Sequence, residues 1–176
     1  PDQCLVKIGS VAFNALGKSF LKHASSQGFK IFLDLKLHDI PNTVYETITG
    51  FNDCKIDMLT VHVSGGEEML RKAMLAGKSI NTKVIGVSML TSLEEEDSLA
   101  LFGNTLEDQI SNLFKIAVEV NIDGIVCSPH ELKIANTILG SHSIKITPGI
   151  RDVKVEDDQA RTMSAKEAIE RGSTFL

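Results

Sequence analysis

The alternation of apolar and polar residues is most regular across residues 30–37, Lys-Ile-Phe-Leu-Asp-Leu-Lys-Leu. A period of two predicts a β-strand with Phe32, Asp34 and Lys36 on one face and the isoleucine and leucines on the other, and we expect the alternation to continue to His38. The apolar face suits burial under helices. The charged face must then look into the interior of a sheet or barrel, where an unpaired charge is costly. These charges therefore predict either a buried structural ion pair or a functional site.

Further β-rich segments follow, and segments with helical periodicity separate them. The predicted strands are residues 5–9, 30–37, 58–64, 83–90, 124–128, 145–150 and 173–176. Strict alternation of strand and helix predicts a parallel α/β sheet, which is either an open doubly wound sheet or a closed (β/α)8 TIM barrel. Chemically active residues at many strand ends, without a Gly-x-Gly-x-x-Gly turn, favour the barrel, whose site is built from loops at one face.

Local signals predict where several helices begin and end. Gly28 and Gly77 occupy positions typical of helix ends. Thr105 is a weak capping signal for the helix that follows it, and Ser164 opens a capping box. The acidic and polar segment 92–104 is predicted to be an exposed loop that contains one helical turn.

Composition narrows the class of protein. The 176 residues are 43% hydrophobic, which suffices for a single domain spanning residues 1–176 with a substantial core. A net charge of −5 argues against a general nucleic-acid binder. No apolar run approaches the roughly 20 residues of a membrane span, so we expect a soluble protein without a membrane partner. Cys4, Cys54 and Cys127 lack the spacing of a metal or disulfide framework, which favours a reducing cytoplasm.

The segment Asp34-x-Lys36-x-x-Asp39-Ile-Pro-Asn-Thr43 closely resembles the signature of the orotidine 5′-monophosphate decarboxylases, the last enzymes of pyrimidine nucleotide synthesis. The resemblance covers nearly the whole chain and implies a (β/α)8 barrel. The family's sequence pattern begins with a strand that carries Ala-Leu-Asp and ends with a strand that runs into Gly-Arg. Neither segment is present in this sequence. A typical barrel also has about 250 residues. We therefore expect that the sequence is truncated at both ends, without the first β/α unit and the end of the last.

The resemblance implies decarboxylation of orotidine 5′-monophosphate without a cofactor or metal, with charge stabilisation by the protein. Lys36 is expected to stabilise the developing carbanion at C6 and to protonate it. Asp34 would lie beside the substrate carboxylate and hold Lys36 charged. Lys7 matches the first lysine of the family, which pairs with that aspartate and touches the ribose. The alternative for Lys7 is a lysine that extends its charged end to solvent at a strand end.

The resemblance also implies a homodimer with a shared active site. Asp39 corresponds to a catalytic residue that enters the neighbouring subunit's site, and Thr43 follows it closely. Ile40 and Thr43 are expected to bind substrate. From the residues alone, Asp39 lies past the strand end and before Pro41, so it need not point in the direction of Lys36.

Four further positions are expected to bind substrate. Thr91 and Ser92 resemble the loop that reads the edge of the pyrimidine, although polar loop residues are common. Arg151 ends the predicted strand 145–150, where barrels often bind phosphate, and its guanidinium offers a planar fork of donors. Gln159 matches the glutamine of a mobile loop over the phosphate, with an ordinary surface glutamine as the alternative. His62 is expected to pack behind the site.

Two alternatives remain open at this stage. Magnesium-dependent keto-hexulose-phosphate decarboxylases and aldolases share the barrel and a similar Asp-x-Lys-x-x-Asp motif, but Lys7 and the segment 40–43 argue against them. A degenerate barrel that only binds a nucleotide would be expected to lose Lys36 or Asp39 first, and both are present.

Overall fold

The computed structural model describes residues 4–140, 142–151 and 163–176. Strands and helices alternate, and six strands form a sheet in the order β1-β2-β3-β4-β5-β6. The pairs β1–β2, β2–β3 and β5–β6 are parallel. The predicted parallel α/β sheet is therefore confirmed. The chain divides into two compact units, Pro1–Ile85 and Gly86–Leu176, which are described separately.

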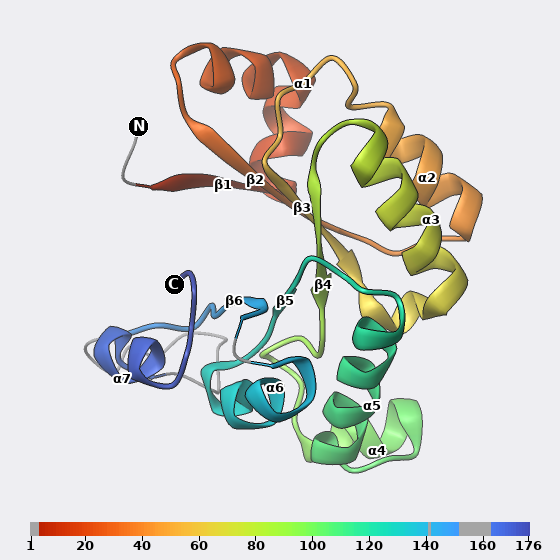
Figure 1. Cartoon of the computed structure of the whole chain (residues 1–176), viewed down its shortest axis with the longest axis vertical. Helices are drawn as coiled ribbons and strands as arrows, with labels where there is room; N and C mark the ends of the chain where they lie inside the picture. Colours follow the sequence, from red (N-terminus) through yellow and green to blue (C-terminus); the bar gives the residue numbers. More distant parts are fainter. Residues whose placement is uncertain (1–3, 141, 152–162) are drawn as a thin grey trace. The chain divides into compact units, whose positions relative to one another are not determined.

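The first unit contains the longest strand and the helices that cover it (Figure 1). Its elements are β1 (Leu5–Gly9), α1 (Ser10–Ser26), β2 (Lys30–Leu37), α2 (Pro41–Thr49), β3 (Met58–His62), the short 3-10 helix η1 (Val63–Gly65), α3 (Gly66–Ser79) and the first part of β4 (Lys83–Val87). Helices α2 and α3 pack side by side (Figure 1). The strands predicted at residues 5–9 and 30–37 are confirmed. Ile31 and Leu33 on β2 are fully buried, as the apolar face of this strand requires.

The second unit carries shorter strands. It comprises α4 (Glu95–Phe102), α5 (Leu106–Glu119), β5 (Gly124–Val126), the short 3-10 helix η2 (Pro129–Glu131), α6 (Leu132–Leu139), β6 (Ile144–Ile146) and α7 (Ala165–Glu170). The predicted strand 173–176 is reduced to a single parallel bridge between Ile146 and Phe175. The predicted strand 145–150 is likewise shortened, since β6 ends at Ile146.

Segment 92–104 was predicted to be a loop, and this is wrong because α4 occupies most of it. Glu94 and Asp97 form a reciprocal capping box, in which the Asp97 carboxylate accepts the Glu94 backbone N–H at 2.9 Å. Gly103 ends the helix in the left-handed conformation. The acidic run therefore favours a helix N-terminus, where negative charge suits the helix dipole.

Gly77 was predicted to end its helix, and this is also wrong because α3 continues to Ser79. A Cβ atom at Gly77 would lie 2.5 Å from Val84 Cγ2 and 2.8 Å from the Thr82 carbonyl oxygen. Asn81 takes the left-handed conformation just beyond the helix, with φ of 56°. Gly77 therefore serves the close packing of α3 against the chain that enters β4.

The predicted helix end at Gly28 and the predicted N-caps at Thr105 and Ser164 are confirmed. Gly28 has φ of 83° just beyond α1. The Thr105 hydroxyl accepts the Asp108 N–H at 3.1 Å, and the Ser164 hydroxyl accepts the Glu167 N–H at 3.3 Å. These bonds satisfy backbone donors that the first turns of α5 and α7 leave unpaired.

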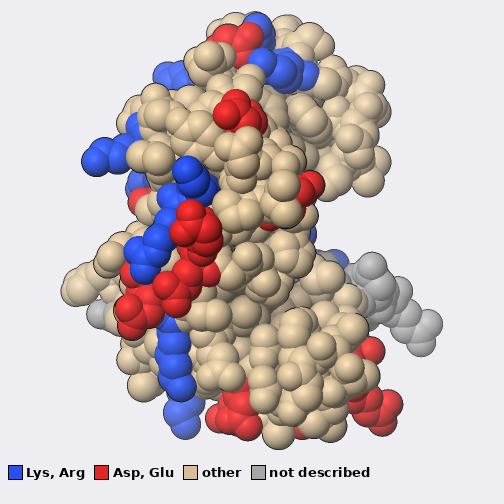
Figure 2. All heavy atoms as spheres, turned by 90° about the vertical axis from the view of Figure 1, so that its right-hand side faces the viewer, with Lys and Arg blue, Asp and Glu red and all other residues tan. Residues whose placement is uncertain are grey.

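The surface carries charges of both signs. On the face drawn in Figure 2, basic and acidic side chains of the described residues are interspersed. Some ion pairs join residues one helical turn apart, such as Arg71 and Glu67 on α3, whose charged groups lie 3.2 Å apart. Within the described part of the chain, no helix combines the length and apolar character that crossing a membrane would require.

Gly77→Ala should lower the free energy of unfolding by about 2 kcal/mol, although alanine is the better helix former. The added methyl group meets the backbone oxygen of Thr82, which cannot rotate away. Urea unfolding followed by circular dichroism measures the change. Lys78→Ala, at an exposed position of the same helix, is the control and should change stability by less than about 0.5 kcal/mol. Equal stabilities for the two variants would contradict the packing role.

Candidate active site

The backbone of β2 is irregular where its charged residues lie. Leu33 pairs with Leu59 of β3, but the next pair joins Leu37 to Val61, so β2 advances four residues while β3 advances two. Between these pairs Lys36 has a φ of 52°, a left-handed conformation that is rare for a residue with a side chain. The prediction of regular alternation as far as His38 is therefore wrong, because the strand bulges at Lys36.

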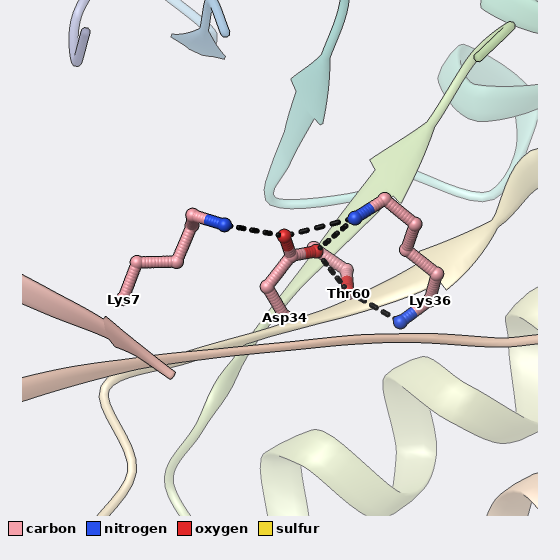
Figure 3. Close-up of polar contacts among 4 residues, drawn as sticks. All are labelled: Lys7, Asp34, Lys36 and Thr60. Atoms are coloured by element: carbon pink, nitrogen blue, oxygen red, sulfur yellow. Dashed lines mark hydrogen bonds and ion pairs between the residues drawn. The ribbon is translucent and has the colours of Figure 1, made fainter. Parts of the chain in front are cut away.

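The Asp34 carboxylate lies between two ammonium groups (Figure 3). Lys7 Nζ, from β1, is 3.2 Å from Asp34 Oδ2, and Lys36 Nζ is 2.9 Å from both carboxylate oxygens. The Asp34 side chain is 9% exposed, whereas those of Lys7 and Lys36 are 59% and 36% exposed. The predicted pairing of Lys7, Asp34 and Lys36 is therefore present, with a buried anion and partly solvated cations.

Electrostatics keep the buried carboxylate ionised. Burial alone raises the pKa of Asp34, but the hydrogen bond and charge of Lys36, followed by those of Lys7, outweigh it and hold the pKa below its usual value. Two lysines face one aspartate, so the cluster has an excess of positive charge. Because both ammonium groups retain solvent-exposed surface, they can also interact with an anionic ligand.

Thr60 of β3 completes the cluster, and sequence reasoning missed it. Its hydroxyl donates to Asp34 Oδ1 at 3.0 Å and accepts the backbone N–H of Lys36 at 2.8 Å (Figure 3). Thr60 is fully buried. The available signal was a hydroxyl residue within the apolar run 58–61, but threonine is common in strands and hydroxyl partners are not visible in a sequence.

His62 lies at the end of β3 beside His38, with ring centroids 5.4 Å apart and an angle of 43° between the rings. Burial lowers the pKa of His62, and the neighbouring charges of His38 and Lys36 lower it further, while Asp34 acts in the opposite direction. His62 is half-buried next to the charged cluster. This position agrees with the expectation that it packs behind the site.

Asp39, Ile40 and Thr43 lie on the surface of the first unit, beyond the end of β2. Asp39 is exposed, and its Oδ1 accepts the backbone N–H of Ile40 at 2.7 Å. Ile40 is 67% exposed immediately before α2, and Thr43 is exposed in the first turn of that helix. Among the described residues, no ion pair joins Asp39 to Lys7 or Lys36. The expectation that Asp39 serves another subunit's site stays a prediction.

The remaining predicted binding residues belong to the second unit. Thr91 is half-buried and Ser92 is exposed in the turn after β4. Arg151 is half-buried. Its guanidinium group donates to the Ile150 carbonyl at 2.8 Å, and its backbone N–H donates to the Met163 carbonyl at 3.0 Å. Gln159 lies outside the described residues. Gly149 has φ of 80°, which lets the backbone turn before Arg151.

In residues 4–140, 142–151 and 163–176, His, Cys, Asp and Glu form no group of three or more that could hold a metal ion.

Comparison with known proteins gives consistent matches over the chain. The family model described as "Orotidine 5'-phosphate decarboxylase / HUMPS family" matches residues 1–176. An orotidine 5′-phosphate decarboxylase of Legionella pneumophila (strain Lens) is 42% identical over 182 residues, covering 100% of this chain and 79% of the relative. The enzyme of the same name from Neisseria meningitidis serogroup B is 41% identical over 181 residues, covering 100% of this chain and 74% of the relative.

Solved structures agree with the sequence comparisons. The crystal structure of orotidine 5′-phosphate decarboxylase from Lactobacillus acidophilus has a TM-score of 0.85 and 34% identity, covering 99% of this chain and 77% of that chain. An uncharacterized conserved protein from Geobacillus kaustophilus has a TM-score of 0.82 and 28% identity, covering 97% of this chain and 76% of that chain.

Lys36→Ala should raise the pKa of Asp34. Burial raises this pKa, and the Lys36 ammonium group contributes most to lowering it. The lowered pKa means that ionised Asp34 contributes stability above its unfolded-state pKa of about 3.9, and this contribution is lost as pH falls through the folded-state pKa. In the variant the folded-state pKa moves towards the unfolded-state pKa, so ionised Asp34 should contribute less stability at neutral pH and less stability should be lost on acidification.

Carbon-13 NMR titration of the aspartate carboxyl groups, together with urea unfolding between about pH 3 and pH 7, measures both effects. Lys30→Ala removes an exposed lysine from the same strand and is the control. An unchanged Asp34 titration in Lys36→Ala would show that Lys36 does not govern this carboxylate.

Proposed function

The chain belongs to the orotidine 5′-phosphate decarboxylase / HUMPS family, and we propose that its activity is the decarboxylation of orotidine 5′-monophosphate to uridine 5′-monophosphate and carbon dioxide. This makes it a carboxy-lyase of pyrimidine nucleotide synthesis. The observation that carries the proposal is the buried Asp34 carboxylate held between Lys7 and Lys36, within the motif of residues 34–43.

The difficulty of this reaction is the charge left on the pyrimidine ring. The bond from C6 to the carboxylate carbon breaks, carbon dioxide leaves, and the electron pair stays on C6. A positive charge that is already in position stabilises this carbanion without further reorganisation. Lys36 supplies that charge and then donates a proton from its ammonium group to C6, after which water returns a proton to the amine.

Asp34 and Lys7 prepare Lys36 for this role. The Asp34 carboxylate accepts hydrogen bonds from both lysines, so it keeps the Lys36 ammonium group oriented. Lys7 is more exposed and extends from the neighbouring strand. We assign it to the ribose of the nucleotide. Asp39 is assigned to the site of a second subunit, where it adds a second carboxylate to the array.

Substrate binding is assigned to loop residues. Thr91 and Ser92 read the pyrimidine edge, Arg151 and Gln159 bind the phosphate, and Ile40 and Thr43 contact the substrate. The turn at Gly149 and the half-buried guanidinium of Arg151 support a phosphate site there, because a planar guanidinium can donate two hydrogen bonds to one phosphate.

We also assign the chain to a single-domain (β/α)8 barrel that forms a homodimer in the cytoplasm. The strand order and the similarity to the solved decarboxylase support the barrel. The exposed positions of Asp39, Ile40 and Thr43 support the dimer, because a second chain can contact them. The spacing of Cys4, Cys54 and Cys127 in the sequence, which does not fit a disulfide framework, supports a reducing compartment.

The activity is tested by the loss of orotidine 5′-monophosphate absorbance in the presence of EDTA. The family description also includes HUMPS, so the magnesium-dependent keto-hexulose-phosphate chemistry is the competing outcome. Turnover that survives EDTA supports the proposal. Turnover of keto-hexulose phosphates that requires magnesium, without loss of orotidine 5′-monophosphate, would replace it.

Lys36→Ala should abolish detectable decarboxylation while the protein stays folded. The variant loses the charge and the proton donor, but the apolar face of β2 remains buried. Stopped assays with radiolabelled substrate measure turnover, and circular dichroism confirms folding. Lys30→Ala, on the same strand, should retain the wild-type rate. Wild-type turnover in folded Lys36→Ala would remove Lys36 from the mechanism.

The shared site predicts complementation between two inactive variants, Lys36→Ala and Asp39→Ala. A mixed dimer has one site with both lesions and one site with neither. Random reassortment of equal pools makes about half of the dimers mixed, so roughly a quarter of wild-type activity should return. If mass spectrometry shows subunit exchange and no activity returns, Asp39 acts within its own chain.

A further inference from the structure

Thr60 is a buried polar residue that contacts the charged cluster and that the mechanism leaves without a role. It lies in the middle of β3, fully buried, between Leu59 and Val61, which are also buried. A hydroxyl has one hydrogen to donate and lone pairs that can accept. Thr60 uses both, because it donates to Asp34 Oδ1 and accepts the N–H of Lys36. It is therefore bonded to both Asp34 and Lys36 of β2.

The bond to Lys36 compensates for the break in the strand ladder. The register shift between Leu33 and Leu37 displaces the intervening backbone from regular pairing with β3. Lys36 also takes a left-handed conformation that its Cβ makes unfavourable. The Thr60 hydroxyl replaces a ladder acceptor for the Lys36 N–H at 2.8 Å. This bond holds the backbone from which the lysine side chain extends.

The hydrogen bond that the Thr60 hydroxyl donates to Asp34 holds the carboxylate of the Lys36–Asp34 ion pair. Asp34 Oδ1 receives hydrogen bonds from both Thr60 and Lys36, at 3.0 Å and 2.9 Å. The carboxylate therefore has a neutral donor from β3 in addition to its two ammonium donors (Figure 3). A buried valine of similar shape would leave the Lys36 N–H without this acceptor and would remove the donor to Asp34.

We propose that Thr60 is a positioning residue that sets the direction of the Lys36 ammonium group by holding the Lys36 backbone and the Asp34 carboxylate at once. The proposal rests on the decarboxylase function assigned above. Thr60 acts through Lys36 and Asp34, so its loss should affect the chemical step more than binding of the nucleotide, whose phosphate and base are assigned to other residues. A displacement of about 1 Å at the reacting group can lower a rate about 100-fold.

Three variants of the full chain test this role. Thr60→Val removes the hydroxyl and keeps the shape, whereas Thr60→Ser keeps the hydroxyl. Thr82→Val is the matched control, because Thr82 is also buried in the first unit and its hydroxyl donates to the Ile56 carbonyl at 2.8 Å, away from the ion pairs. Circular dichroism and urea unfolding give the folded fraction by which each rate is corrected.

Thr60→Val should lower kcat about 100-fold and change KM less than about threefold, because the lost interaction orients the reacting group. Thr60→Ser should restore kcat to within about fivefold of the wild type, and Thr82→Val should retain the wild-type kcat. If Thr60→Val keeps the wild-type kcat, or if its loss equals that of Thr82→Val, the proposal is overturned.

A second measurement does not require turnover. Because the Thr60 hydroxyl donates to the ionised carboxylate, its removal in Thr60→Val should raise the pKa of Asp34 in a carbon-13 NMR titration, and Thr82→Val should leave it unchanged. An unchanged Asp34 titration in Thr60→Val overturns the positioning role. If wild-type protein fails to decarboxylate orotidine 5′-monophosphate, the proposed function fails, while this titration still decides whether Thr60 positions the pair.

Discussion

The ionised Asp34 carboxylate, buried at the centre of the first unit's charged cluster, is the constraint on which the site depends. Burial of an ionised carboxylate is unfavourable unless hydrogen bonds and opposite charges compensate for the lost water. Here Lys7 from β1, Lys36 from β2 and Thr60 from β3 supply that compensation. Three adjacent strands therefore converge on one side chain, and the parallel pairing of these strands becomes part of the chemistry of the site.

The bulge in β2 follows from the same constraint. In a regular strand, the side chains of residues i and i+2 extend from the same face in parallel directions. The left-handed backbone at Lys36 re-aims its side chain, and the ammonium group then contacts both oxygens of Asp34. Such a conformation is stable only when its surroundings favour it. Here the bonds that the Lys36 ammonium group donates to Asp34 and that the Lys36 backbone N–H donates to Thr60 do so.

Sequence patterns predicted β2 with Asp34 and Lys36 on one face, because period-two alternation and a local motif are both contained in a short segment. The pairing of Lys7 with Asp34, 27 positions apart, was expected only from the family resemblance. Sequence patterns did not predict the bulge, since the register with β3 depends on residues that are distant in the sequence. Thr60 escaped notice for the same reason, because its partners lie 24 and 26 positions away. The helix α4 was missed because its acidic first turn and its exposed leucines resemble a loop, although its capping residues are local.

Charge balance explains why the same lysine can serve both halves of the proposed reaction. The substrate carboxylate is an anion, and when it leaves as neutral carbon dioxide the negative charge moves to C6. The total charge facing Lys36 is unchanged, so the site does not need to rearrange as the bond breaks. Two lysines and one aspartate leave one positive charge to be met by the substrate. A carboxylate such as Asp39 from a second chain would then oppose the substrate's charge directly, so its contribution to the rate depends on where it lies relative to the scissile bond.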